Sequence, residues 1–305
     1  MPAPPRLRPH GRRDASAARR DAATGVHPAS VWRWLREAWQ EGAFLLVWPA
    51  WWALWLAAGG APPWRVALLF ALVPWLAHGM GRTFGRFLGG WLDRRGQIAD
   101  QGAPAWRGRD ALQAFVGLLL AGLALEFLAN RLTLYLGAAA LAMALIHPVV
   151  QRVSYLSQAF LGLAFGWGVA VAFAAVQGEI PPLAWLLLCA CALWASACCV
   201  WQAMARREDD LHRGVCSTAI LLGDMALLAQ GLLSGGALLA LVLVGQRAAL
   251  GAAYFMALGV AALLIGAQFR IARGCEPTAC LRAFALGGWV GAVVFAGIAV
   301  ALALK

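Results

Sequence analysis

The sequence predicts an all-α, polytopic membrane protein built as a bundle of nine transmembrane helices, and three observations lead to this prediction. Of its 305 residues 62% are apolar and 13% are charged, which is more apolar surface than one soluble core can bury. Apolar runs of about 20 residues, the length that crosses a bilayer, recur along the chain. Basic residues gather in alternate connections between these runs.

Each predicted helix is an apolar run bounded by a short polar break. In chain order the nine runs are 41–59, 64–84, 111–129, 132–149, 158–176, 182–204, 220–245, 251–269 and 284–303. The seventh is the least regular, because Asp224 and Gln230 lie in it and Gly235-Gly236 interrupts it. Polar groups inside a membrane require partners, so both side chains are expected to contact other helices.

The basic residues predict the orientation of the bundle. With a cytoplasmic N-terminus, 21 of the 25 basic residues lie in cytoplasmic segments. These are the eight arginines before residue 41, the six between 82 and 109, Arg152, the three between 206 and 213, Arg270, Arg273 and Arg282. The bias predicts a multi-pass protein of a bacterial-type inner (plasma) membrane, and its placement favours a lipid bilayer over nucleic acid as the partner.

Two regions differ in composition. Residues 1–30 hold six arginines and no apolar run, and are predicted to be a disordered basic tail that sets topology or attracts anionic headgroups. Residues 31–305 are predicted to form the transmembrane domain.

Three separated segments carry a resemblance to a known family. They are GAFLLVWP at 42–49, LGLAFGW at 161–167 and STAILLG at 217–223. In order and spacing this chain resembles the UbiA superfamily, in particular the 4-hydroxybenzoate polyprenyltransferases. The resemblance covers nearly the whole transmembrane domain and implies a UbiA-type bundle around a central cavity.

The resemblance also implies a chemistry. Members of the family release pyrophosphate from a polyprenyl diphosphate and join the allylic cation to an aromatic acceptor such as 4-hydroxybenzoate, as in ubiquinone biosynthesis. Two Asp-rich motifs at facing helix ends hold Mg²⁺ ions against the diphosphate, because carboxylate oxygens suit this hard cation.

The first Asp-rich motif is degenerate in this chain. The family pattern Asn-Asp-x-x-Asp-x-x-x-Asp falls on Gly85, Arg86, Gly89 and Asp93, so only the last acid is present.

The second motif is degenerate as well. Its three acids fall on Cys199, Arg206 and Asp210, although Glu208 and Asp209 keep the loop partly acidic. The residual magnesium candidates are therefore Asp93, Glu208 and Asp210, and the resemblance implies a Mg²⁺ site that has lost most of its ligands.

Other polar positions differ from the family in the same region. A Tyr-Pro pair that ends the fourth span reads His147-Pro148, and the Lys-Arg pair that follows reads Gln151-Arg152.

Three interpretations remain open. The first is a non-catalytic scaffold, a pseudoenzyme that keeps the fold. The second is diphosphate binding by guanidinium groups, which pair with phosphate without a metal. The third is ordinary prenyl transfer through other ligands. The candidate diphosphate-binding residues are Arg86, Arg152, Arg206 and Arg207.

Two alternatives compete with a substrate site. Basic residues at cytoplasmic helix ends commonly anchor helices and set topology without binding substrate. A small-molecule transporter would show repeated halves with broken helices, and no repeat is visible in this sequence.

Overall fold

The computed structural model describes residues 36–93, 116, 130–212 and 214–305, and for residues 82–93 it describes the backbone alone. The chain divides into two units, Met1–Glu41 and Gly42–Lys305. The bundle of helices in the second unit holds the candidate site, and the predicted tail 1–30 lies outside the described residues.

Every regular element in the described residues is helical. Their bounds are η1 Trp39–Ala43, α3 Phe44–Ala58, α4 Trp64–Asp93, α6 Arg131–Val153, α7 Ser157–Gly166, α8 Gly168–Gln177, α9 Pro182–Ala205, α10 Arg207–His212, α11 Thr218–Leu222, η2 Gly223–Met225, α12 Ala226–Arg247, α13 Ala252–Ile271 and α14 Pro277–Ala303.

Eight of these helical segments are long and apolar enough to cross a membrane. They are Arg36–Ala58, Trp64–Gly81, Arg131–Val153, Ser157–Gln177, Pro182–Ala205, Thr218–Arg247, Ala252–Ile271 and Pro277–Ala303. They match eight of the nine predicted runs, and the remaining run, 111–129, lies outside the described residues except for residue 116. Large apolar side chains such as Leu232 (70% exposed) and Leu263 (76% exposed) point outward, as they do on a surface that meets lipid. The chain is an all-α, multi-pass membrane protein.

Two boundaries differ from those expected. The last span begins at Pro277 rather than 284, because Pro277 stands at the first helical position, where a missing N–H costs nothing. The seventh span is broken near its start and not at Gly235-Gly236. Gly223 adopts a left-handed φ of 53°, which separates α11 from η2 and leaves Asp224 before α12.

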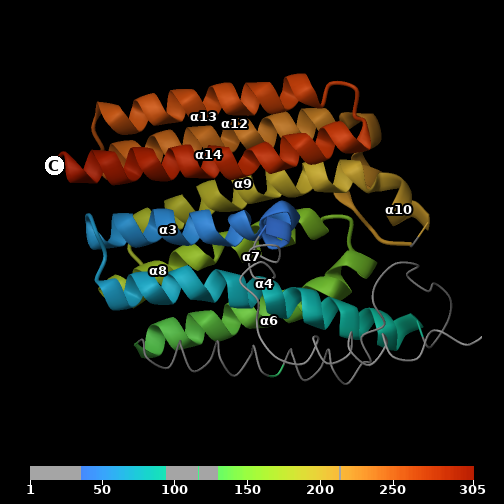
Figure 1. Cartoon of the computed structure of the whole chain (residues 1–305), viewed down its shortest axis with the longest axis horizontal. Coiled ribbons are helices and arrows are strands. Elements are labelled where there is room, and N and C mark those ends of the chain that lie inside the picture. Colours follow the sequence, from blue (N-terminus) through green and yellow to red (C-terminus); the bar gives the residue numbers. More distant parts are fainter. Residues whose placement is uncertain (1–35, 94–115, 117–129, 213) are drawn as a thin grey trace, which may run out of the picture. The chain divides into compact units, whose positions relative to one another are not determined.

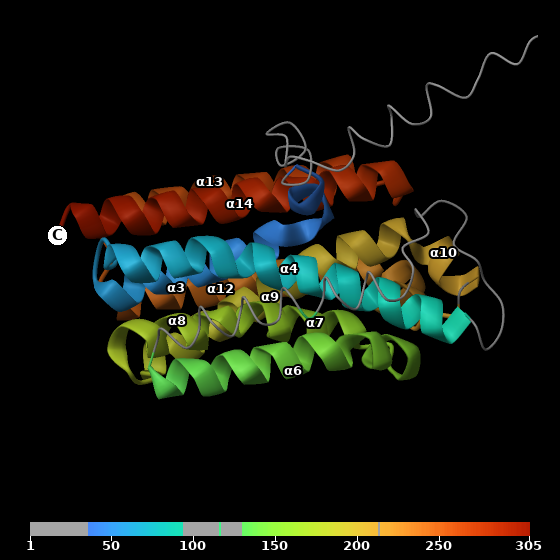
Figure 2. The same cartoon turned by 60° about the horizontal axis from the view of Figure 1, so that its bottom comes forward.

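Helix α9 lies at the centre of the bundle. It contacts α7 on one side and α12 and α14 on others, as the two views in Figures 1 and 2 show. Among the eight spans, α9 has the largest buried share, with 67% of its most apolar stretch inside the bundle. Close approach to α7 depends on Gly162, where an added Cβ would lie 2.7 Å from the carbonyl oxygen of Ala192.

The buried Gln230 on α12 finds partners on α9. With its amide oriented to suit its neighbours, the nitrogen donates to the Ala197 carbonyl at 2.7 Å and the oxygen accepts from Trp201 Nε1 at 2.6 Å. Both amide groups of a polar side chain are thus satisfied inside the membrane, which removes most of the cost of burying it.

Candidate functional site

The candidate residues whose side chains the structure describes lie toward one end of the bundle. Helices α4, α6 and α9 all end there, and α10 lies beside them (Figure 1). Residues 206–217 cross this end between α9 and α11. The two degenerate motifs therefore lie in the last part of α4 and in the end of α9 together with α10.

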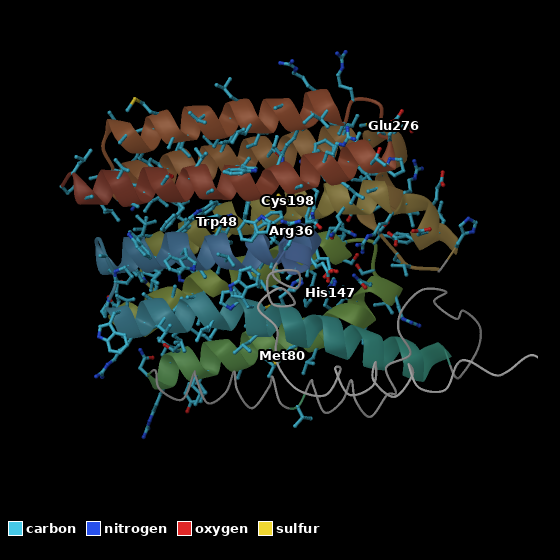
Figure 3. All side chains as sticks on the ribbon, in the orientation of Figure 1. Arg36, Trp48, Met80, His147, Cys198 and Glu276 are labelled. Carbon is cyan, nitrogen blue, oxygen red and sulfur yellow. The ribbon has the colours of Figure 1, made fainter. Side chains whose placement is uncertain are left out.

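Cys199 occupies the first acid position of the second motif and points into the bundle. Its side chain is 3% exposed, on the central helix α9. Neighbouring Cys198 lies against α14, where a Cβ added at Gly287 would be 2.8 Å from its sulfur (Figure 3). A thiol is a soft ligand that suits zinc or copper better than magnesium. A buried thiol at this position therefore does not suit Mg²⁺.

Arg206 caps the C-terminus of α9 and is exposed. Its backbone N–H bonds to the carbonyls of Gln202 and Ala203, both at 3.2 Å, while its own carbonyl accepts from Asp210 at 2.8 Å. Arg206 thus stands at the end of the bundle, two turns from Cys199, and its side chain is exposed.

Helix α10 carries the remaining acids of the second motif. Glu208 is exposed and Asp210 is half-buried. The carbonyl of Asp210 accepts from the Val215 amide at 2.9 Å, which folds the segment after α10 back toward α11. Both carboxylates therefore belong to the short helix that follows the end of α9.

Arg207 turns toward the start of the seventh span. Its Nη2 lies 3.8 Å from the position that a Cβ would take at Gly223. The structure therefore brings Arg207 to the α11–η2 turn rather than leaving it extended from α10.

Arg152 lies in the last turn of α6 and is exposed. Its backbone carbonyl is 3.7 Å from Cys216 Sγ, so Arg152 and the segment before α11 are neighbours. Arg152, Arg206 and Arg207 all belong to this end of the bundle. The placement of the Arg86 and Asp93 side chains lies outside the described residues, although Asp93 is the final residue of α4.

A magnesium cluster does not assemble among the side chains that the structure describes. No group of three or more His, Cys, Asp or Glu residues comes together in them. Glu208 and Asp210 carry carboxylates, whereas Cys199 is a buried thiol and Arg206 a guanidinium. This donor set does not fit the family's Mg²⁺ site.

A set of hydrogen bonds that the motifs did not indicate ties residues 151–158 to residues 216–218, and we call it the α6–α11 clamp. The Cys216 amide donates to the Gln151 carbonyl at 2.9 Å, and Ser157 Oγ donates to the Cys216 carbonyl at 3.1 Å. Thr218 donates through its amide to Gln158 Oε1 at 2.8 Å and through its hydroxyl to the Tyr155 carbonyl at 2.8 Å. The clamp fixes the start of the seventh span against the connection between α6 and α7.

His147 stands beside the clamp, close to where α6 joins α7 (Figure 3). Its Nε2 is 2.7 Å from Gln151 Nε2, and its ring is parallel to that of Phe160, with centroids 6.2 Å apart. The sequence marked His147 and Gln151 only as departures from the family. Their spacing of one helical turn was the one signal that they would meet.

Comparison with known proteins agrees with the fold. The UbiA prenyltransferase family model matches residues 46–295. The chain is 46% identical over 277 residues to a 4-hydroxybenzoate octaprenyltransferase of Xanthomonas campestris pv. campestris (strain B100), covering 90% of this chain and 92% of that protein. It is 45% identical to a 4-hydroxybenzoate octaprenyltransferase of Xylella fastidiosa (strain 9a5c), with 88% and 91% covered.

Solved structures share the fold at lower identity. The apo structure of a UbiA homologue from Aeropyrum pernix K1 has a TM-score of 0.72 at 22% identity, covering 85% of this chain and 98% of that one. A UbiA homologue from Archaeoglobus fulgidus, bound to DMAPP and Mg²⁺, has a TM-score of 0.60 at 17% identity, covering 88% and 99%. With a family match over most of its length and close relatives along nearly all of it, this chain belongs to the UbiA prenyltransferase family.

Proposed function

We propose that this protein binds a polyprenyl diphosphate in the bacterial inner membrane, with its N-terminus cytoplasmic, and transfers the prenyl group slowly to an aromatic acceptor such as 4-hydroxybenzoate. The observation that carries the proposal is the 46% identity, over 90% of the chain, to a 4-hydroxybenzoate octaprenyltransferase. In the transfer the allylic carbon–oxygen bond breaks, pyrophosphate leaves, a ring carbon of the acceptor bonds to the allylic carbon, and the ring proton is released.

Guanidinium groups take part of the role that carboxylate-held metal has in the family. Departing pyrophosphate develops several negative charges, and stabilising them is commonly the largest contribution to such catalysis. Arg152, Arg206 and Arg207 lie at the end of the bundle that the second motif occupies. Arginine pairs with phosphate oxygens through two parallel hydrogen bonds, so these residues support diphosphate binding without a complete Mg²⁺ cluster.

Magnesium use is proposed to be weak or absent. Asp93, Glu208 and Asp210 are the carboxylates left for one ion. The relative from A. fulgidus is described as bound to DMAPP and Mg²⁺. In this chain Cys199 and Arg206 replace two oxygen ligands, so the metal would contribute little to the affinity for diphosphate.

A second candidate is a non-catalytic scaffold or a prenyl-diphosphate-binding protein. The burial of Cys199 favours it, because a neutral thiol at this position supplies no charge to an ionising substrate. Aromatic packing in the bundle is kept, as between Phe44 and Trp194, whose ring centroids are 6.1 Å apart.

Release of pyrophosphate from a long-chain prenyl diphosphate separates these functions. The purified protein in nanodiscs is given 4-hydroxybenzoate, and Mg²⁺ is varied against a chelator. Slow, acceptor-dependent release that survives chelation is expected. Binding without release would favour the second candidate, and fast release that needs Mg²⁺ would contradict the proposed loss of the metal site.

A further inference from the structure

Helix α11 contacts other elements at both of its ends. At its start, Thr218 donates its hydroxyl hydrogen to the Tyr155 carbonyl at 2.8 Å, and its amide donates to Gln158 Oε1, also at 2.8 Å. At its end lies the Gly223 turn, where Arg207 Nη2 is 3.8 Å from the position of an added Cβ. This five-residue helix therefore links the α6–α7 connection to the guanidinium of Arg207.

The start of α11 depends on Thr218. Its side chain is buried, and its Oγ1 lies 2.7 Å from Gln158 Oε1 as well as near the Tyr155 carbonyl. Ser217, the N-cap of α11, makes no side-chain capping bond to it. A helix of so few residues has little stability of its own. Its position is therefore set by the contacts of Thr218 with the α6–α7 connection.

The end of α11 is the surface against which Arg207 lies. Arg207 begins α10 and is exposed, and a long exposed side chain samples many rotamers unless its neighbours limit them. Gly223 has a left-handed φ of 53° and no Cβ, so the guanidinium lies beside the backbone of this turn. An ordered arginine loses less conformational entropy when it binds an anion. A shift of α11 would move this surface and release the side chain.

We propose that Thr218 is a positioning residue for diphosphate binding. By fixing α11 against the α6–α7 connection, it holds the Gly223 turn in place, and the turn in its turn places Arg207. Thr218 does not touch the ligand and acts through the guanidinium. This inference rests on the proposed function, because it names the residue that keeps one arginine of that site in position.

The affinity of the full chain in nanodiscs for geranylgeranyl diphosphate, measured with excess chelator and below every unfolding midpoint, tests the proposal. Thr218→Val keeps the shape of the side chain and removes its hydroxyl. We expect this variant to bind about tenfold more weakly than the wild type, as for one lost hydrogen bond. Thr218→Ser keeps the hydroxyl and should bind as the wild type does.

Thr133→Val is the matched control for a loss of stability alone. Thr133 is 0% exposed, and its hydroxyl bonds to Asn130 Oδ1 at 3.0 Å at the start of α6, the end of that helix opposite the α6–α7 connection. Its replacement should lower the unfolding midpoint and leave the affinity for the diphosphate unchanged.

A double-mutant cycle shows whether Thr218 acts through Arg207. Arg207→Ala should weaken binding by about tenfold or more, as for a lost charged hydrogen bond. The double variant Thr218→Val with Arg207→Ala should bind no more weakly than Arg207→Ala alone, because the guanidinium that Thr218 positions is then absent.

Four results would overturn the inference while the wild type still binds the diphosphate. They are wild-type affinity in Thr218→Val, no recovery in Thr218→Ser, an equal loss of affinity in Thr133→Val, and losses of Thr218→Val and Arg207→Ala that simply add. A wild type that does not bind geranylgeranyl diphosphate at all would contradict the proposed function, and this inference with it.

Discussion

The Trp52 indole donates a hydrogen bond from Nε1 to the carbonyl oxygen of Gly291 at 3.0 Å, joining α3 to α14 across 239 residues of sequence. Trp52 is 0% exposed. A Cβ added at Gly291 would overlap the ring of Trp48, one turn earlier on α3. Gly291 on α14 is therefore close to the indole rings of both Trp48 and Trp52 on α3.

Replacing Gly291 by alanine should destabilise the protein by about 1–3 kcal/mol, because the new methyl group has to displace the Trp48 ring. Thermal unfolding in nanodiscs measures the change. Gly259→Ala on α13 is the matched control, since nothing lies within 4 Å of its added Cβ. Equal midpoints for the two variants would show that α3 and α14 are not packed as described.

Gly162→Ala should separate α7 from α9. The added methyl would lie 2.7 Å from the Ala192 carbonyl oxygen on α9 and would overlap Ser196 Oγ, and the α9 backbone cannot give way as a flexible side chain can. We expect a loss of stability of about 1–3 kcal/mol. Gly266→Ala on α13, which meets open space, should be neutral. A Gly162→Ala protein as stable as Gly266→Ala would contradict the close approach of the two helices.

Trp201→Phe should leave the oxygen of the Gln230 amide without its donor inside the membrane. The expected cost is about 1–3 kcal/mol, measured by unfolding. Adding Gln230→Leu to this variant should recover part of the loss, because no buried amide would remain unsatisfied. If the double variant loses as much unfolding free energy as Trp201→Phe and Gln230→Leu lose together, the two side chains do not interact.

Restoring an acid at Arg206 should restore part of the magnesium dependence. Arg206→Asp places a carboxylate at the family's second acid position, next to Glu208 and Asp210. The site is exposed, so the fold should tolerate the change. We expect prenyl diphosphate affinity to become more sensitive to a chelator than it is in the wild type. Arg206→Gln removes the same charge without adding a ligand, and should show no such gain.

Hydropathy and charge were enough to predict the all-α membrane class and the eight described spans, because the bilayer dictates the length and composition of each helix. They could not locate the break at Gly223, where the decisive feature is one left-handed backbone angle. Nor could they show that Trp52 is buried rather than at the membrane interface, since that depends on which helix it faces.

For a similar reason, the sequence named candidate site residues but not their surroundings. Motif spacing identified Cys199 and Arg206, and the structure places one inside the bundle and the other at its end. The α6–α11 clamp joins Thr218 to Tyr155, 63 residues apart, and no local pattern encodes such a pairing. Convergence of Arg86 with Arg206 stays a prediction, because the Arg86 side chain lies outside the described residues.

The affinity of the protein for a long-chain prenyl diphosphate, measured with excess chelator, tests the central claim most directly. We predict that binding survives chelation and that Arg86→Ala and Arg206→Ala each weaken it, by about 1.5–3 kcal/mol for a lost charged hydrogen bond. Arg65→Ala should bind as wild type does, since Arg65 is predicted to face the opposite side of the membrane and its guanidinium lies 5.5 Å from the Trp64 ring centroid. Loss of binding on chelation, or equal binding by all three variants, would contradict a diphosphate site built on arginines.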